Sequence, residues 1–240
     1  MNMRPFVVGT RRSRLALYQA GVVLDLLRSA RPDLSFELRE YTASGDTMLH
    51  IPAPELAADA FTDVIERALA DGEIDAAVHS YKDLPPDAAP GLIVAAVPVR
   101  ADPREALVSA SGSRLGDLPP GAVVGTSSER RAAAVLALRP DLVVKPIRGP
   151  VDARVQMVFE GEYDAAVLAL AGLDRLGMGD KVSEIFDADL MPPPAGQGAL
   201  AVQCRADDEL ALAILADIDD IPLHNAVDAE LRLSRGATTS

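Results

Sequence analysis

The chain has 240 residues, 49% of them hydrophobic, and its formal net charge at pH 7 is −13. An acidic balance of this size excludes a general nucleic-acid or anionic-membrane binder, because both need an extended basic surface. The single cysteine excludes an internal disulfide, and three scattered histidines beside it give no metal-ligand spacing, so we expect no metal site.

The N-terminal apolar run is too short for a signal peptide, and no stretch approaches 18 consecutive apolar residues. These features predict a cytoplasmic protein. Its oligomeric state is left open by the sequence.

The first half of the chain alternates strand-like with helix-like runs, which is typical of βαβ architecture. Small apolar residues mark the strands, and longer amphipathic runs mark the helices. The predicted strands are 5–9, 34–41, 75–80 and 92–99, and the predicted helices are 13–29 and 60–71.

The same alternation begins again after residue 100 and predicts a second α/β domain. Its predicted strands are 122–125, 141–147 and 165–169, with helices at 127–138, 150–160 and 170–177. A Pro- and Gly-rich stretch at 191–200 then leads to a strand at 199–205 and a helix at 207–217, so we expect the chain to return to the first domain. The predicted limits are 1–97 plus 198–220 for the first domain, 98–197 for the second, and 221–240 for a C-terminal helix and tail.

Four short segments that follow predicted strands carry cationic or acidic residues: "GTRRSRLAL" (9–17), "HSYKDLP" (79–85), "GTSSERRAA" (125–133) and "IRGPVDARV" (147–155). Because the carboxyl ends of parallel strands share one edge, we expect these segments to meet at a cleft between the domains. Guanidinium groups pair with carboxylates through two hydrogen bonds, so the cleft is predicted to take a polycarboxylate. The cations expected there are Arg11, Arg12, Lys82, Arg130, Arg131, Arg148 and Arg154.

These segments, in order with "RADPREALVS", "GEYDAAVLALAGLDRLG" and "PPPAGQGALAVQCR", resemble hydroxymethylbilane synthase, also called porphobilinogen deaminase, over residues 5–235. The resemblance implies two α/β domains like those of periplasmic binding proteins, with the ligand between them. It also implies an enzyme that joins porphobilinogen units with loss of ammonia through an azafulvene-type intermediate.

Residue roles follow from the same resemblance. Asp83 would be the catalytic carboxylate, assisted by Lys82. The residues that would hold the substrate's acetate and propionate groups are Arg11, Ser13, Ser80, Thr126, Ser128, Arg130, Arg131, Arg148, Arg154 and Gln197.

The sequence departs from the family at several places, and two of them bear most on function. The family attaches a dipyrromethane cofactor to a cysteine in a Gly-Gly-Cys loop before a third domain, whereas this chain ends at "GATTS". Cys204 lies in a predicted apolar strand, so we expect it to be a buried small residue, with no cofactor attached and no third domain. The segment between Asp46 and Phe61 also lacks the lysines and glycines that are usual in the family.

Two explanations for the missing cysteine stay open: a divergent relative, which the altered segment favours, or a fragment of an ordinary synthase. The leading function is a deaminase acting on porphobilinogen or a related pyrrole dicarboxylate, without a full cofactor-anchored tetrapyrrole. The alternative is a non-catalytic protein that binds a carboxylate. Asp83 beside Lys82 favours the enzyme, because a binder of anions gains nothing from a carboxylate in its cleft.

Overall fold

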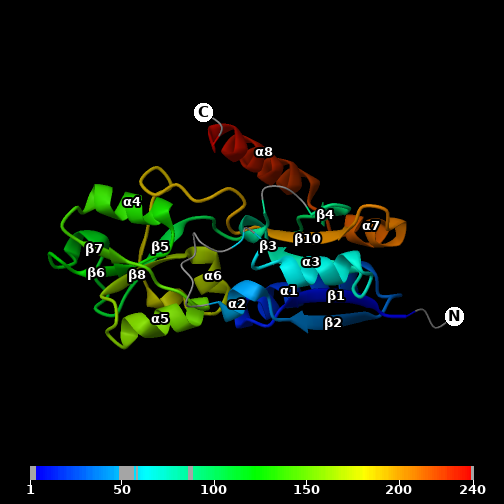
Figure 1. The fold of residues 1–240 in the computed structure, drawn as a ribbon, viewed down its shortest axis with the longest axis horizontal. Helices are drawn as coiled ribbons and strands as arrows, with labels where there is room; N and C mark the ends of the chain where they lie inside the picture. Colours follow the sequence, from blue (N-terminus) through cyan, green and yellow to red (C-terminus); the bar gives the residue numbers. More distant parts are fainter. Residues whose placement is uncertain (1–3, 49–56, 58, 86–88, 239–240) are drawn as a thin grey trace. The chain divides into compact units, whose positions relative to one another are not determined.

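A computed structural model describes residues 4–48, 57, 59–85 and 89–238, with the side chains of the last helix described as far as Ser234. The chain divides into two compact units. The first holds the described residues up to Thr47 together with those of Ala57–Ala101 and those from Ala195 onward. The second holds Asp102–Pro194 (Figure 1).

The first unit is built on a five-stranded mixed sheet with the order β2-β1-β3-β10-β4. Strand β1 is parallel to both β2 and β3, whereas β10 is antiparallel to β3 and β4. The strands are β1 Phe6–Arg11, β2 Phe36–Tyr41, β3 Ala76–Ser80, β4 Leu92–Ala96 and β10 Leu200–Arg205.

Helices cover both faces of this sheet because its strands alternate two sets of apolar side chains. In β1, Val8 packs in a cluster with residues of α1 and α7, whereas Val7 packs with residues of α3. Strands buried on both faces show no alternation with polar residues, which explains runs such as "FVVG". The helices are α1 Arg14–Ala30, α2 Ser44–Thr47, α3 Asp63–Ala70, α7 Glu209–Ala216 and α8 Ile221–Thr238, with a 3-10 turn, η2, at Tyr81–Asp83.

The second unit repeats this arrangement with a sheet of order β7-β6-β8-β5-β9. Strand β6 is parallel to β7 and β8, and β5 is antiparallel to β8 and β9. Its strands are β5 Glu105–Ser109, β6 Val123–Gly125, β7 Val143–Lys145, β8 Ala165–Ala169 and β9 Val182–Ile185. Its helices are α4 Glu129–Leu138, α5 Val151–Phe159 and α6 Leu170–Arg175, with short turns η3 Leu115–Asp117 and η4 Gly179–Lys181.

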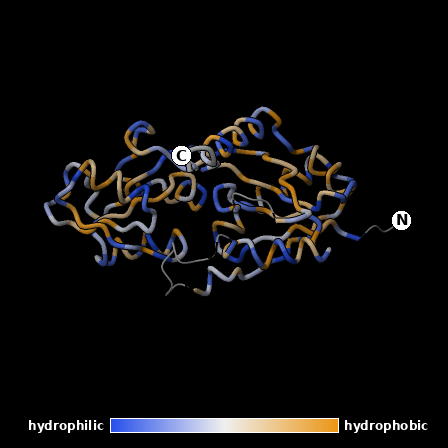
Figure 2. The backbone as a smooth tube through the Cα atoms, turned by 45° about the horizontal axis from the view of Figure 1, so that its top comes forward, coloured by the Kyte–Doolittle hydropathy of each residue, from blue (hydrophilic) through white to orange (hydrophobic). Residues whose placement is uncertain are grey.

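Two apolar clusters, one on each face, form the core of the second unit. One contains Leu107, Val124 and Val135, and the other contains Val108, Val158 and Leu173. Figure 2 shows the hydropathy of each residue along the chain, with hydrophobic stretches alternating with hydrophilic ones.

The predicted α/β class and the alternation of elements are confirmed, but two strands were missed. Strand β5 begins with a charged residue, Glu105, and β9 has the polar residues Ser183 and Glu184 at its centre. Apolar periodicity therefore gave no signal for either strand. The predicted strands 92–99 and 141–147 are shorter than expected, and β10 and β5 run against their neighbours.

The limits of the units lie a few residues from the predicted ones, at 101/102 and 194/195, and α8 groups with the first unit. None of the described helices combines the length and the apolar character that spanning a bilayer requires. The departure noted between Asp46 and Phe61 lies mostly outside the described residues.

Candidate active site

A small pocket of about 50 Å³ opens in the first unit where β1 and β3 end. These strands are parallel, so their carboxyl ends lie at the same edge of the sheet, as the sequence predicted. Four predicted site residues line the pocket: Arg11, Ser13, Ser80 and Asp83. The other lining residues are Leu15, Ala16, Gln19, Phe61, Thr62, Val78 and His79.

Arg11, the last residue of β1, is held by contacts on two sides. Its guanidinium group donates two hydrogen bonds to Asp46, with 3.1 Å between Nε and Oδ2. It also lies over the ring of Phe61, 4.8 Å from the ring centroid, in a cation–π contact. Arg11 is therefore positioned in the pocket wall, with a protein carboxylate already bound to it.

Ser13 and Ser80 place hydroxyl groups at the same edge. Ser13 is the N-cap of α1, and its Oγ accepts a hydrogen bond from the backbone N–H of Ala16 at 3.3 Å. Ser80 and Gln19 are joined by hydrogen bonds between the Ser80 hydroxyl and the Gln19 amide, at 2.9 Å and 3.2 Å.

Gln19 is a site residue that the sequence analysis missed. It lies on the buried side of α1 with Ala16, Ala20 and Val23, and only 4% of its surface is exposed. A polar side chain within an apolar helical stripe was the signal, since a buried amide needs hydrogen-bond partners.

Lys82 and Asp83 lie in η2, the turn that follows β3. Lys82 Nζ donates a hydrogen bond of 2.9 Å to Oε1 of Gln197, which is fully buried. The structure therefore brings Gln197 to Lys82, and half-buried Asp83 to the pocket. Arg12 is exposed and does not line this pocket.

His79, on β3, has its pKa lowered to about 4, chiefly by burial and also by the positive charge of Arg11. It is therefore neutral at pH 7. Its Nε2 has no hydrogen-bond partner among the described residues.

In the second unit, the predicted residues cluster where β6 and β7 end. Ser128 is the N-cap of α4 and accepts a hydrogen bond from the N–H of Arg131, and Thr126 Oγ1 accepts one from the N–H of Ser128. Arg154 Nε donates to the carbonyl of Gly149 at 2.7 Å, and Arg148 is half-buried just after β7. These are neighbouring strand ends, because β6 and β7 are parallel.

Arg130 and Arg131 share one carboxylate, that of Glu105 on β5. Arg131 Nη2 lies 2.8 Å from Glu105 Oε2, and Arg130 also reaches this carboxylate. Burial alone would raise the pKa of Glu105, but Arg131 and Arg130 outweigh it and lower the pKa below its usual value. Glu105 is fully buried. With its carboxylate ionised, the triad of Glu105, Arg130 and Arg131 carries a net charge of only +1.

The sequence analysis missed Glu105, although an acid inside the run "REALVS" was visible. Because Arg131 is buried and bonded to Glu105 and to the carbonyl of Val167, it also has a structural role. The sequence analysis placed the site residues of the first unit and those of the second unit at one cleft, and this stays a prediction.

The amino-acid sequence was also compared with known proteins. Residues 6–213 match the family profile described as porphobilinogen deaminase, dipyromethane cofactor binding domain. Curated relatives named porphobilinogen deaminase include those of Brevibacillus brevis (44% identical; 95% of this chain, 74% of the relative) and Roseiflexus sp. (48%; 93% and 74%). A third, from Thermus thermophilus, is 46% identical over 98% of this chain and 76% of its own.

The chain belongs to the porphobilinogen deaminase family. It spans about three quarters of the length of these relatives. The resemblance drawn from the seven sequence segments is thereby confirmed.

Solved structures support the two-unit fold of this porphobilinogen deaminase relative. The methionine-binding protein MetQ superposes with a TM-score of 0.56 at 12% identity, covering 95% of each chain. The VFT2 domain of Bordetella pertussis BvgS gives a TM-score of 0.53 at 17% identity, over 94% of this chain and 93% of that one. At these identities the likeness concerns the fold alone, and it confirms the predicted periplasmic-binding-protein-like architecture.

The resemblance implies that a cysteine thiol attaches the cofactor named in the family description, and Cys204 does not fit that role. Its side chain is fully buried in β10. Burial, with Asp208 nearby, raises the pKa of this thiol to about 11, so the reactive thiolate is disfavoured. Since Cys204 is the one cysteine in the 240 residues, we derive no step through an attached cofactor. Among the residues that the structure describes, no group of three or more His, Cys, Asp or Glu side chains is placed to hold a metal ion.

Proposed function

We propose that this chain binds porphobilinogen, or a related pyrrole dicarboxylate, and catalyses the loss of ammonia from it. One observation carries the proposal: Arg11, Ser13, Ser80 and Asp83 line a single pocket in the first unit. Membership of the porphobilinogen deaminase family supports the same chemistry.

In this proposal, Arg11 binds one substrate carboxylate through its planar guanidinium group. The carboxylate of Asp46 occupies that group in the structure, so the substrate has to displace Asp46 or share Arg11 with it. The hydroxyl groups of Ser13 and Ser80 donate hydrogen bonds to the same carboxylate.

The chemical step breaks the C–N bond of the protonated aminomethyl group. Both electrons of the bond leave with nitrogen as ammonia, and the remaining positive charge spreads over the pyrrole as an azafulvenium ion. Asp83 stabilises this cation with its negative charge, which is most effective in a pocket that excludes water. A water molecule or the α-carbon of a second pyrrole then attacks the methylene carbon and loses a proton to solvent, which leaves a neutral product.

In the second unit, a further set of groups is proposed to bind carboxylates. They are the hydroxyl groups of Thr126 and Ser128 and the cations that follow β6 and β7: Arg130, Arg131, Arg148 and Arg154. Lys82, paired with Gln197, is proposed to assist Asp83 from the first unit.

The deciding experiment mixes the purified protein with porphobilinogen and measures released ammonia and intact protein mass in one sample. Ammonia without added protein mass supports a deaminase that works without an anchored primer. Ammonia with a stable pyrrole adduct assigns this chain to a primed synthase. Binding without ammonia supports the alternative, a carboxylate-binding protein, and contradicts the enzyme.

Asp83→Asn tests the acid, because it removes the charge but keeps the shape. We expect ammonia release to fall at least about 100-fold, since a charge that stabilises the transition state is lost. Porphobilinogen binding, measured by calorimetry, is expected to change less than about threefold. Asp25→Asn, the same change at an exposed position of α1, is the control and should match the wild type. Normal turnover by Asp83→Asn would remove Asp83 from the mechanism.

A further inference from the structure

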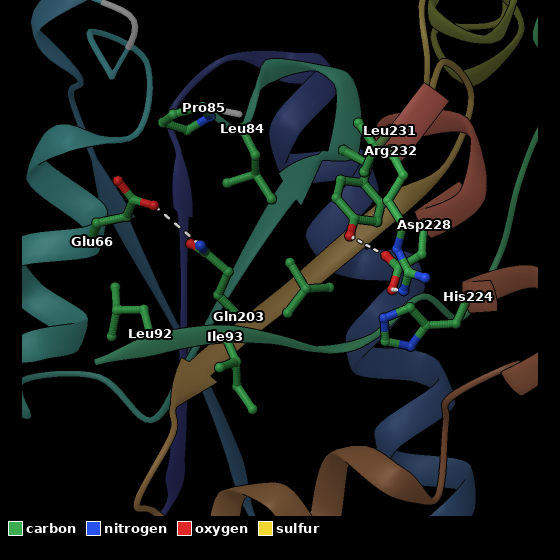
Figure 3. A pocket seen from close by; sticks show the side chains of 12 residues that line it. Glu66, Leu84, Pro85, Leu92, Ile93, Gln203, His224, Asp228, Leu231 and Arg232 are labelled. Atoms are coloured by element: carbon green, nitrogen blue, oxygen red, sulfur yellow. Dashed lines mark hydrogen bonds and ion pairs between the residues drawn. The ribbon is translucent and has the colours of Figure 1, made fainter. Parts of the chain in front are cut away.

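The turn that carries Lys82 and Asp83 begins at Tyr81, which packs in a buried apolar cluster with Val97, Ala199, Ala201 and Val227. It is a three-residue 3-10 helix, a geometry with weaker hydrogen bonds than an α-helix. A second pocket, of about 350 Å³, lies against it and is lined in part by Tyr81, Leu84 and Pro85. In Figure 3, Leu84 and Pro85 border this pocket, opposite His224 and Asp228 of α8. Polar contacts with α8 add to the apolar packing that holds the turn.

Helix α8 supplies one such contact through Asp228. The hydroxyl group of Tyr81, the first residue of the turn, donates a hydrogen bond of 3.0 Å to Asp228 Oδ1 (dashed line at Asp228 in Figure 3). Tyr81 is 7% exposed and the Asp228 side chain is 34% exposed, so this bond is partly buried at the edge of the pocket. It joins residues 147 positions apart in the sequence.

Helix α8 supplies a second contact through Glu230. Both oxygens of Glu230 accept hydrogen bonds from Arg100, at 2.6 Å and 3.0 Å, and Oε2 also accepts one from the N–H of Gly196 at 3.1 Å. Arg100 in turn donates to the carbonyl of Gln197, the residue that binds Lys82.

Gly196 lies directly on the turn. Its φ is +71°, and a Cβ added there would lie 3.3 Å from the Cβ of Tyr81. Glycine therefore allows the Gly196–Gln197 loop to approach Tyr81 closely. Because Glu230 binds this loop, it also restrains the turn that the loop contacts.

We infer that α8 is a positioning element for the proposed acid: Asp228 acts through Tyr81, and Glu230 acts through Arg100 and the Gly196–Gln197 loop. Asp228 and Glu230 are two positions apart, so they point to different sides of the helix and hold two separate segments. A catalytic group displaced by about 1 Å loses much of its effect, so the rate should depend on both contacts. This inference rests on the proposed function of Asp83.

Tyr81→Phe tests the first contact because it removes only the hydroxyl group. We expect kcat for ammonia release to fall about fivefold to tenfold, the rate equivalent of one net hydrogen bond, with KM within about twofold. Hydrogen exchange should quicken at the amide of Leu84, which is bonded within the turn to the carbonyl of Tyr81. Leu233→Ser, at a position of α8 that is 76% exposed, is the matched control and should leave kcat and exchange unchanged.

Variants of Asp228 distinguish a role in positioning the turn of Asp83 from a general loss of structure. Asp228→Asn keeps an oxygen that accepts the tyrosine hydroxyl and should restore most of the rate, whereas Asp228→Ala should match Tyr81→Phe. The double variant Tyr81→Phe, Asp228→Ala should be no slower than either single variant, because both remove the same bond.

An active wild type with unchanged kcat in Tyr81→Phe and Asp228→Ala would overturn the positioning role and leave the proposed function intact. Equal losses in Asp228→Asn and Asp228→Ala would also overturn it, since the retained acceptor would have no effect. A wild type that releases no ammonia would instead overturn the proposed function, and the role in catalysis with it.

Discussion

At the scale of single residues, the buried carboxylate of Glu105 pairs with two of the predicted site cations and offsets part of their charge. It pairs with Arg130 and Arg131, and Arg131 is itself only 8% exposed. A buried charge that loses its partner is costly, since neither water nor another ion replaces the lost contact. We therefore regard this triad as the electrostatic centre of the second unit.

Glu105→Gln should lower the free energy of unfolding at pH 7 by about 3 kcal/mol, because Arg131 is left without its buried counter-ion. Denaturant titration measures this loss. Asp180→Asn breaks an exposed ion pair with Lys181 and should cost less than about 1 kcal/mol.

Glu105→Gln should also change how the free energy of unfolding depends on pH under acidic conditions. The folded-state pKa of Glu105 lies below its unfolded value of about 4.5, so its contribution is present above that pH and is lost as the pH falls toward the folded-state pKa. Stability curves from pH 6 to pH 2.5 should show this loss in the wild type but not in Glu105→Gln. A variant curve parallel to that of the wild type would contradict the assignment.

At the scale of elements, the short helix α2 and the start of α3 fix Arg11 from two directions. Asp46 of α2 binds the guanidinium group, and Phe61, just before α3, lies over it. This arrangement needs Gly45, because a Cβ there would lie 2.6 Å from the ring of Phe61. The identity of one glycine thus controls the geometry of Arg11, the arginine that we propose binds substrate.

Gly45→Ala should lower the free energy of unfolding by about 1–3 kcal/mol, since the ring of Phe61 must move. It should also weaken porphobilinogen binding, because Arg11 loses its stacking partner. Thermal denaturation and calorimetry measure the two effects.

Gly21→Ala is the control for this substitution. It lies within α1 with no other group inside 4 Å of the added Cβ, so it should raise stability by about 0.5–1 kcal/mol. Equal effects of the two substitutions would show that the contact with Phe61 is unimportant.

At the scale of the whole molecule, the chain builds two sheets of the same topology, one in each unit. In each, the second strand in the order, β1 or β6, is parallel to both neighbours, and the fourth, β10 or β5, is antiparallel to both of its neighbours. Each unit has its own apolar core, with Ile214 in the first and Leu173 in the second. We expect the two cores to respond separately to mutation.

Ile214→Ala and Leu173→Ala should each cost about 2–5 kcal/mol through lost burial and the cavity left behind. Native-state hydrogen exchange should quicken within the first unit for Ile214→Ala and within the second for Leu173→Ala. Uniform acceleration over both units in either variant would show that they unfold as one.

Much of the fold and part of the site could be predicted because their signals are local. Apolar runs and N-caps such as Ser13 and Ser128 located the principal helices and most strands, and parallel pairing of β1 and β3 brought Arg11 and Asp83 to one pocket. Strand β5 was missed because its apolar run after Glu105 is short, and β9 was missed because Ser183 and Glu184 lie at its centre. Each carboxylate binds an arginine from another element, a partner that the local pattern does not show.

The sequence by itself determined the α/β class, the order of most elements and the family, because ordered motifs and apolar periodicity are properties of neighbouring residues. Only the tertiary structure decided which charges are already paired: Arg11 with Asp46, and Arg130 and Arg131 with Glu105. It also decided that β10 inserts between β3 and β4 and that α8 binds the turn of Asp83 through Tyr81. Such contacts join distant positions, and their partners are selected by the packing of whole elements rather than by local sequence.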